Sequence, residues 1–204
     1  MLAVIKIGGS CAGLLDLRRW TAAIAGCAGQ VVIVPGGGPF AEAVRAAQPA
    51  MGFDDAAAHH MALLAMEQFG RALASFDVRC VLADSVTAFR HGLGDNKVPV
   101  WSPTRMTLDA VDVPASWDIT SDSLAAWLAG ELGAQRLMLM KQVALPREPI
   151  GADDLAVRGI VDKAFPQFLA RSGAAASIVG PADHMAVAAA LCDDLQIGTP
   201  IVVR

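Results

Sequence analysis

The chain has 204 residues, of which 16 are basic and 20 acidic, so its formal net charge is −4. This length predicts one domain with a sizeable core, and the negative charge argues against a nucleic acid as the main partner. Hydrophobic residues make up 54% of the sequence, yet no apolar run approaches the roughly 18 residues of a membrane span. We therefore expect a globular protein without a membrane partner.

The N-terminus and the cysteines indicate a reducing compartment. The first apolar run is short and contains Lys6, which suits a strand better than a signal peptide. The four cysteines are scattered, with neither the paired spacing of a metal site nor a disulfide framework. We expect a cytoplasmic location. The high apolar content also indicates a buried subunit interface, so we expect a homo-oligomer.

The first predicted element is the apolar run Leu2–Ile7, which ends in Gly8 and Gly9. A continuous apolar run is typical of a strand buried on both faces of a parallel sheet. Residues 11–25 are predicted to form a helix, whose first amides would point back at the glycine turn. This arrangement makes an anion site that commonly holds phosphate, with Lys6 beside it. A solvated lysine at a strand end explains this stretch equally well.

A second strand, glycine-rich turn and helix follow the first. Residues 31–34 form a β-branched run that ends in Pro35–Gly38, and a helix is predicted over 40–48 with Pro39 in its first turn. Two such turns in one sheet can place two phosphate cradles in the same crevice at the carboxyl ends of the strands. Phosphoryl transfer needs this pairing, because one site holds the donor's phosphates and the other holds the acceptor.

Strands and helices alternate through the rest of the chain. After a break over 49–53, a long helix capped by Asp54 or Asp55 is expected to run to Phe76. Further strands are predicted over 78–83, 87–90, 98–101, 136–143, 176–179 and 199–203, further helices over about 123–132, 160–172 and 185–191, and a polar loop over 146–158. This alternation indicates a parallel or mixed sheet with helices on both faces.

Two common nucleotide-binding motifs are excluded. Gly36, Gly38 and Ala41 match the dinucleotide fingerprint, and Asp54 lies at about the right distance beyond them. In that fold the acid ends a second strand, whereas Asp54 is expected to open a helix, so we reject this interpretation. The phosphate-loop pattern GxxxxGK[ST] is absent from the sequence, which excludes the commonest class of ATPase.

Five segments in order resemble the motifs of the amino acid kinase family. They are Lys6–Ser10, Val34–Gly38, Thr120–Ala126, Leu137–Val143 and Gly159–Lys163, and together they span nearly the whole chain. The resemblance implies a single domain that forms a three-layer αβα sandwich with a mainly parallel central sheet. It also implies ATP with Mg²⁺ as the donor, an acceptor-side half over about 1–115 and a nucleotide-side half over about 116–204.

The resemblance also implies roles for individual residues. Lys6 would contact the transferred phosphoryl group, Asp122 would orient the catalytic lysines, and Lys163 would neutralise charge on the donor side. ATP-phosphate binding is implied for Gly8, Gly9, Ser10 and Lys141, and acceptor binding for Gly36, Gly37 and Gly38, with no metal ligand assigned. The chemistry agrees, because a transition state with widely spread charge is stabilised by fixed cations and amides.

Simpler explanations exist for two of these residues. Asp122 would also favour the first turn of its helix through the macrodipole. Lys163 would also suit a solvated helix start. Lys141 is more unusual, because it lies inside an apolar run where a lysine needs a partner.

The acceptor side offers further candidates. His59 and His60 lie on the long helix whose start should face the acceptor, and their side chains point about 100° apart, so they cannot easily bind one metal together. We predict that His60 contacts the acceptor, the alternative being a partly exposed histidine. Trp101 and Trp117 would form either an aromatic wall around the acceptor or part of the core.

One branch of the family is most similar, namely the kinases of methanofuran biosynthesis that act on [5-(aminomethyl)furan-3-yl]methyl phosphate. The similarity lies in segments 61–68, 116–122 and 159–166 and in the short connection after the 40–48 helix. The resemblance implies a small-molecule phosphate acceptor that is converted to a diphosphate. Additional candidates to bind its phosphate are Arg45 and Arg90, and candidates to bind its amine are Asp54 and Asp84.

Two other functions stay open at this point. One is a kinase for a carboxylate, a carbamate or another phosphate monoester. The other is a non-catalytic protein that binds a nucleotide or an oxyanion on the same fold. The intact set of Lys6, Asp122 and Lys163 argues against the second.

Overall fold

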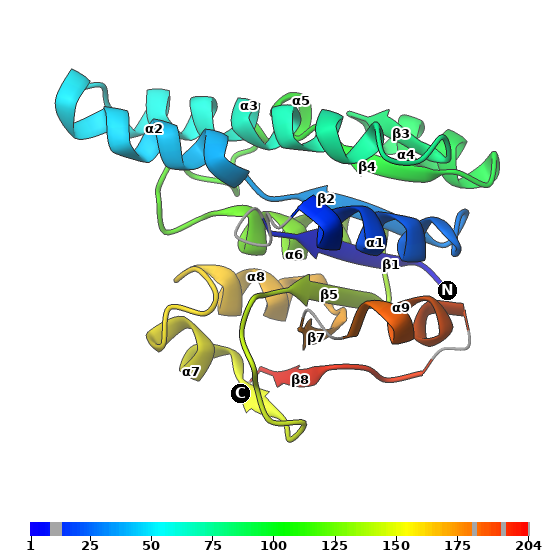
Figure 1. The fold of residues 1–204 in the computed structure, drawn as a ribbon. Coiled ribbons are helices and arrows are strands. Elements are labelled where there is room, and N and C mark those ends of the chain that lie inside the picture. Colours follow the sequence, from blue (N-terminus) through cyan, green and yellow to red (C-terminus); the bar gives the residue numbers. More distant parts are fainter. Residues whose placement is uncertain (9–13, 181–182, 193–194, 204) are drawn as a thin grey trace.

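One eight-stranded sheet organises the molecule, with the strand order β3–β4–β2–β1–β5–β7–β8–β6 (Figure 1). The computed structural model describes residues 1–8, 14–180, 183–192 and 195–203. The strands are β1 (Ala3–Ile7), β2 (Val31–Pro35), β3 (Cys80–Ala83), β4 (Val98–Trp101), β5 (Arg136–Met140), β6 (Ile150–Gly151), β7 (Ala175–Val179) and β8 (Thr199–Val202). All paired neighbours are parallel except β7 and β8.

Helices cover both faces of this sheet. They are α1 (Leu14–Ala25), α2 (Gly38–Met51), α3 (Asp55–Ala74), α4 (Val86–Gly94), α5 (Thr104–Thr107), α6 (Ser121–Leu132), α7 (Ala152–Val157), α8 (Phe165–Ser172) and α9 (His184–Cys192). Side chains of α6 and α8 form one core cluster with the sheet, and side chains of α1 and α9 form a second. The predicted three-layer αβα sandwich with a mainly parallel sheet is confirmed. Within the described ranges, no helix has both the length and the apolar character needed to span a membrane.

Strand β1 lies at the centre, between β2 and β5, and all five of its residues are buried. Successive side chains of a strand point to opposite faces. Ile5 therefore packs with Trp20 in the core on the α1 side, and Val4 packs with Leu124 in the core on the α6 side. Lys6 follows the same alternation and points to the α6 side. The apolar strand β1 thus places the ammonium group of Lys6 in the interior of the protein.

The strand predicted over residues 87–90 is wrong, because this segment lies within α4. The Ser85 side chain caps the helix by accepting a hydrogen bond from the amide of Ala88. Phe89 is fully buried and Gly92 packs one turn later. The capping residue and the spacing of buried positions outweigh the β-branched residues at the start of the segment.

The break predicted at Pro49 is also misplaced, since α2 continues to Met51. Pro49 lies in the last turn, where the missing N–H removes a single hydrogen bond of the helix. The helix ends at Gly52, which has a φ of 74° and donates its N–H to the carbonyl of Gln48 at 2.8 Å. Only residues 52–54 separate α2 from α3, which agrees with the expected short connection.

The segment 146–158 is not entirely a loop, because it contains β6 and α7. Leu155 anchors this short helix and is fully buried. The helix predicted from Ile160 begins only at Phe165. Residues before it form a turn whose carboxylate, Asp162, is bonded to α6. The other predicted strands and helices are confirmed to within a few residues where the structure describes them, and residues 11–13 of the first predicted helix lie outside the described residues.

Candidate active site

Three charged side chains meet in the interior at the carboxyl end of the sheet. Lys6 comes from β1, Asp122 from the first turn of α6, and Lys141 directly follows β5. Lys6 Nζ lies 2.9 Å from Asp122 Oδ1, and Lys141 Nζ donates a hydrogen bond of 2.5 Å to Oδ2. Lys6 is 6% exposed and Asp122 is 3% exposed. We call these three residues the lysine–aspartate cluster.

The cluster holds two ammonium groups against one carboxylate. Burial alone would raise the pKa of Asp122, but the positive charges of Lys6 and Lys141 lower it below its usual range, so the carboxylate is ionised. Burial and the charge of Lys6 lower the pKa of Lys141, and Asp122 opposes this shift. A buried cation without a full counter-charge is unfavourable. An anion bound beside the cluster would supply the missing charge.

Glycines at the ends of β1 and β2 bring backbone close to the cluster. The amide of Gly36 donates to the carbonyl of Ile7 at 2.8 Å, which joins the two turns. A Cβ on Gly37 would lie 2.2 Å from the Cβ of Ala41, and Gly38 has a φ of 57°, so both positions require glycine. Helix α2 begins here without a capping side chain or an acidic residue in its first turn. Its free N-terminal amides form a suitable anion site.

The start of α6 is held by Asp162. Its Oδ2 accepts hydrogen bonds from the amide and hydroxyl of Thr120 at 2.9 and 2.8 Å and from the amide of Ser123 at 3.0 Å, and its Oδ1 accepts the Ser123 hydroxyl. Asp162 thereby fixes the helical turn that carries Asp122. Sequence reasoning missed this residue, although it directly precedes Lys163.

Lys163 does not join the cluster. Its Nζ lies 2.9 Å from Asp118 Oδ1, with side-chain exposures of 79% and 55% for the lysine and the aspartate. It therefore lies on the outside of the turn that carries Asp162. The structure brings Lys6, Asp122 and Lys141 together, whereas Lys163 lies outside the cluster and is exposed to solvent.

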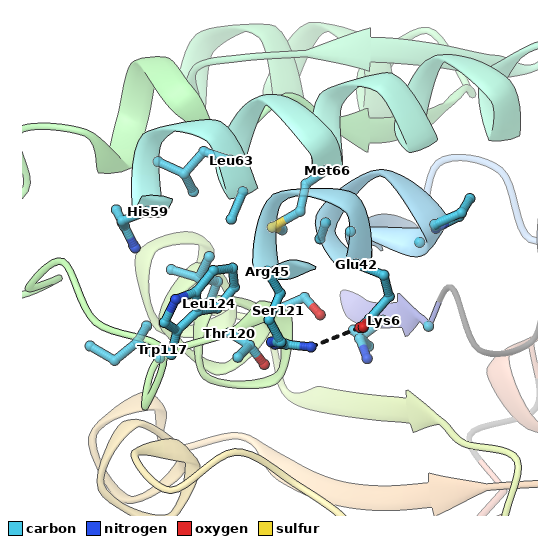
Figure 2. A pocket seen from close by; sticks show the side chains of 18 residues that line it. Lys6, Glu42, Arg45, His59, Leu63, Met66, Trp117, Thr120, Ser121 and Leu124 are labelled. Atoms are coloured by element: carbon cyan, nitrogen blue, oxygen red, sulfur yellow. Dashed lines mark hydrogen bonds and ion pairs between the residues drawn. The ribbon is translucent and has the colours of Figure 1, made fainter. Parts of the chain in front are cut away.

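A cavity of about 410 Å³ opens from Lys6 toward α3 (Figure 2). Figure 2 shows Lys6 at one end and His59, Leu63, Trp117 and Leu124 at the other. The polar end is lined by Lys6, Gly8, Gly36, Gly37, Gly38, Thr120 and Ser121, and the apolar lining includes Ala62, Leu63, Met66, Trp117, Ile119 and Leu124. The cavity therefore suits a small molecule that is anionic at one end and apolar along most of its length. We call it the first cavity.

Trp117 forms a wall of this cavity, as one of the two predictions for it expected. The Arg45 guanidinium carbon lies 4.6 Å from the centre of the Trp117 ring system, and the Trp117 indole donates to Gln48 Oε1 at 2.7 Å. Arg45 also donates to Glu42 Oε1 at 2.7 Å. These contacts hold the segment before α6 against α2. Trp101 is instead fully buried and belongs to the core, as the alternative for it expected.

His59, and not His60, faces the first cavity. His59 is 8% exposed and lines the cavity, whereas His60 is half-buried and does not. Adjacent residues on a helix cannot share one face. The structure therefore moves the candidate acceptor contact from His60 to His59.

The remaining predicted residues are distributed as follows. Gly9 and Ser10 lie outside the described residues. Asp54 caps α3 by accepting the amide of Ala57, and Asp84 pairs with Arg105 at 3.2 Å. Neither they nor Arg90 line the first cavity. Among the described residues, no group of three or more His, Cys, Asp or Glu side chains could hold a metal ion.

A second cavity of about 420 Å³ lies at the carboxyl ends of β5 and β7. Its wall is braced by Asp183, which accepts the amide of Gly180 at 2.7 Å and a hydrogen bond from Arg147 at 2.9 Å. Its lining is Gln142, Val143, Ala144, Leu145, Arg147, Ile178, Gly180, Asp183, Gly198 and Thr199. Gln142, which directly follows Lys141 in the sequence, lines this second cavity, whereas Lys6 lines the first.

Removing the carboxylate of Asp162 should destabilise the protein. In Asp162→Ala, two backbone amides and two hydroxyls at the start of α6 lose their acceptor, and we expect a loss of about 2 kcal/mol or more in the free energy of unfolding. Urea unfolding measures this loss. The matched control is Asp109→Ala, an exposed aspartate; equal stability of the two variants would contradict the capping role.

Removing the charge of Asp122 should leave two buried lysines uncompensated. We expect Asp122→Asn to lose about 3–5 kcal/mol in the free energy of unfolding, and the double variant Asp122→Asn with Lys141→Met to regain part of it. Because the folded-state pKa of Asp122 is lowered, the wild-type contribution exists above the unfolded pKa of about 3.9 and is lost as pH falls through the folded value. Urea titrations against pH measure both effects. A double variant less stable than Asp122→Asn would refute the account.

Comparison with known proteins agrees with this geometry. Residues 1–144 match the amino acid kinase family. The chain is 27% identical over 180 residues to the [5-(aminomethyl)furan-3-yl]methyl phosphate kinase of Methanocaldococcus jannaschii, which covers 81% of this chain and 82% of that protein.

Two solved structures share the fold. The uridylate kinase of Archaeoglobus fulgidus has a TM-score of 0.75 and 18% identity, covering 99% of this chain and all of that one. The UMP kinase of Ureaplasma parvum has a TM-score of 0.74 and 15% identity, covering 98% of each chain. With a family match over residues 1–144 and this shared fold, the chain belongs to the amino acid kinase family.

Proposed function

We propose that the protein is an ATP-dependent kinase that converts [5-(aminomethyl)furan-3-yl]methyl phosphate to its diphosphate in methanofuran biosynthesis. Its enzyme class is that of its relatives, which are kinases. The observation that carries the proposal is the polarity of the first cavity, which runs from cations and free amides to an apolar, aromatic end. A phosphate ester of a small ring has the same polarity. The similarity to the archaeal kinase that bears this name supports the choice of ring.

The acceptor phosphate would bind at the N-terminus of α2. The uncapped amides around Gly37 and Gly38 face the first cavity, and the Arg45 guanidinium lines it as well. A volume of about 410 Å³ lies in the range of small-molecule sites. Residues of the second expected half also line this cavity, so the acceptor site would draw on both halves of the chain; they are Trp117, Ile119, Thr120, Ser121 and Leu124.

The donor would bind in the second cavity, with its phosphates directed to Gly8 and Lys141. The described residues offer no three-ligand metal cluster, and this fits Mg²⁺, which usually keeps several waters and is held largely by nucleotide phosphates. Asp162, whose charge acts on Lys141, would be a candidate to complete its coordination. Bound with ATP, Mg²⁺ would neutralise charge on the β- and γ-phosphate oxygens.

The chain's residues can perform an in-line transfer. An oxygen of the acceptor phosphate attacks the γ-phosphorus, a new P–O bond forms, and the bond to the bridging oxygen of ADP breaks. A phosphate monoester is already ionised near neutral pH, since its second pKa is about 6, so the attack needs no general base. Lys6 lines the first cavity together with Gly8 and Gly36 and would neutralise the transferred group, while Asp122 holds Lys6 in place.

The proposal is tested by ADP release in the presence of the furan phosphate, of UMP and of amino-acid carboxylates. We expect turnover with the furan phosphate, and a fall in kcat of about 10³-fold in Lys6→Ala, because a preorganised cation at the transferred group is lost. Lys97→Ala is the matched control, since Lys97 contacts the carbonyl of Val78 and does not line the first cavity. Turnover with a carboxylate alone would assign a different acceptor. Binding of ATP without any turnover would favour a non-catalytic protein.

We expect Lys163 to contribute to nucleotide binding and to add little to the stability of the fold. Its ion pair with Asp118 is exposed, and such pairs contribute little to stability, so the lysine can leave Asp118 for a bound phosphate at low cost. We expect Lys163→Ala to lower kcat/KM for ATP by about 10-fold or more, through a lost charge-assisted contact, and Asp118→Asn to change it little. Steady-state kinetics compare the two variants. If both lower it equally, the ion pair itself is what matters.

A further inference from the structure

The apolar end of the first cavity contains one polar atom without a partner. His59 Nε2 is buried and has no hydrogen-bond partner among the described residues. Buried polar atoms are nearly always paired, and an unpaired one needs an explanation. Figure 2 shows the His59 ring projecting from α3 into the cavity toward Trp117. Nε2 is therefore free to pair with a molecule bound in the cavity.

The neighbours of His59 cannot supply that partner. Leu63 and Leu124 line the same end of the cavity. The charged residues that line the cavity are Lys6 on β1 and the pair Glu42 and Arg45 on α2, which are bonded to each other. The lining residues of α6 and of the segment before it are not titratable. The ring therefore faces an apolar chamber in which no described side chain pairs with Nε2.

The charge state of His59 determines which kind of ligand group can pair with its Nε2. Burial lowers the pKa of His59, and the neighbouring His60 lowers it further, so the imidazole is neutral near neutral pH. A neutral imidazole has one nitrogen that accepts a hydrogen bond. An ammonium group is a strong donor and is disfavoured beside a protonated histidine. A neutral, buried acceptor at the end opposite the phosphate site suits a primary amine.

We infer that His59 determines acceptor specificity by accepting, at Nε2, a hydrogen bond from the ammonium group at the apolar end of a phosphate-bearing substrate. The identity of that substrate rests on the proposed function, in which the acceptor carries an aminomethyl group. The phosphate would bind at the glycine turns, and the amine would bind at His59 of α3. A site that leaves a buried acceptor unpaired discriminates against an analogue without the donor.

The test compares two acceptors that differ only in the amine, namely the aminomethylfuran phosphate and its methylfuran counterpart. We expect the wild type to prefer the amine in kcat/KM, and His59→Leu to lose about 10- to 100-fold on the amine with little change on the methyl compound. His59→Gln keeps an acceptor oxygen and should retain part of the preference. His60→Leu is the matched control, because His60 does not line the cavity. Equal losses on both acceptors would overturn the inference.

The pH dependence gives a second readout. Because the pKa of His59 lies below the ordinary imidazole value of about 6.5, His59 gains its proton only at more acidic pH, where it repels the ammonium. The amine-to-methyl ratio of kcat/KM should therefore fall in acid in the wild type and stay flat in His59→Gln. The acceptor phosphate titrates identically in both compounds, so the ratio removes its contribution. A ratio that is independent of pH in the wild type contradicts the inference.

Calorimetric binding separates this inference from the proposed function. Both furan phosphates are titrated into the wild type and His59→Leu in the presence of a non-hydrolysable ATP analogue. Selective binding of the amine that is lost in His59→Leu, without turnover in the wild type, would refute the proposed function and support the role of His59. Turnover of both compounds without selectivity would refute the role of His59 alone. Absence of binding would refute both.

Discussion

The sharing of one buried carboxylate by two ammonium groups is the interaction on which the rest of the site depends. The cluster joins a strand, a helix start and the end of another strand, which carry Lys6, Asp122 and Lys141. It therefore forms only when α6 is packed correctly against the sheet. Desolvating three charges is unfavourable, and one positive charge remains in excess. A bound phosphate would relieve that excess. Ligand binding and stability are therefore coupled at the same three residues.

Strand order explains why the cluster and the cavities meet. The chain leaves β1 for β2 on one side, while β5 pairs with β1 on the other. Crevices in open α/β sheets form where neighbouring connections diverge in this way, at the carboxyl ends of the strands. Gly8, Gly36 and Lys141 all follow strands at that edge. Backbone amides and ammonium groups thus converge without any long loop to position them.

Sequence patterns predicted much of the fold because continuous apolar runs and glycine turns leave few alternatives. The roles of single charged residues were ambiguous. Only the order of the five motifs favoured a catalytic role for Lys6 and Asp122 over a structural one. His59 lines the first cavity and His60 does not. His59 shares its helical spacing with Leu63 and Met66, which also line the cavity, and this pattern would have favoured His59 over His60. Asp162 could not be found, because its hydrogen bonds join segments about 40 residues apart.

Different residues form the charged end and the apolar end of the first cavity, and this affects how its ligand specificity can change. The charged residues are anchored in β1, α6 and the end of β5, where any shift disturbs the cluster. The apolar end is lined by α3, by Leu124 of α6 and by Trp117, which contacts Gln48 and Arg45 of α2. A substitution on the cavity face of α3 alters the chamber without touching Asp122 or the glycine turns. Substitutions on α3 can therefore change the apolar end while the lysine–aspartate cluster stays intact, because α3 carries none of its three residues.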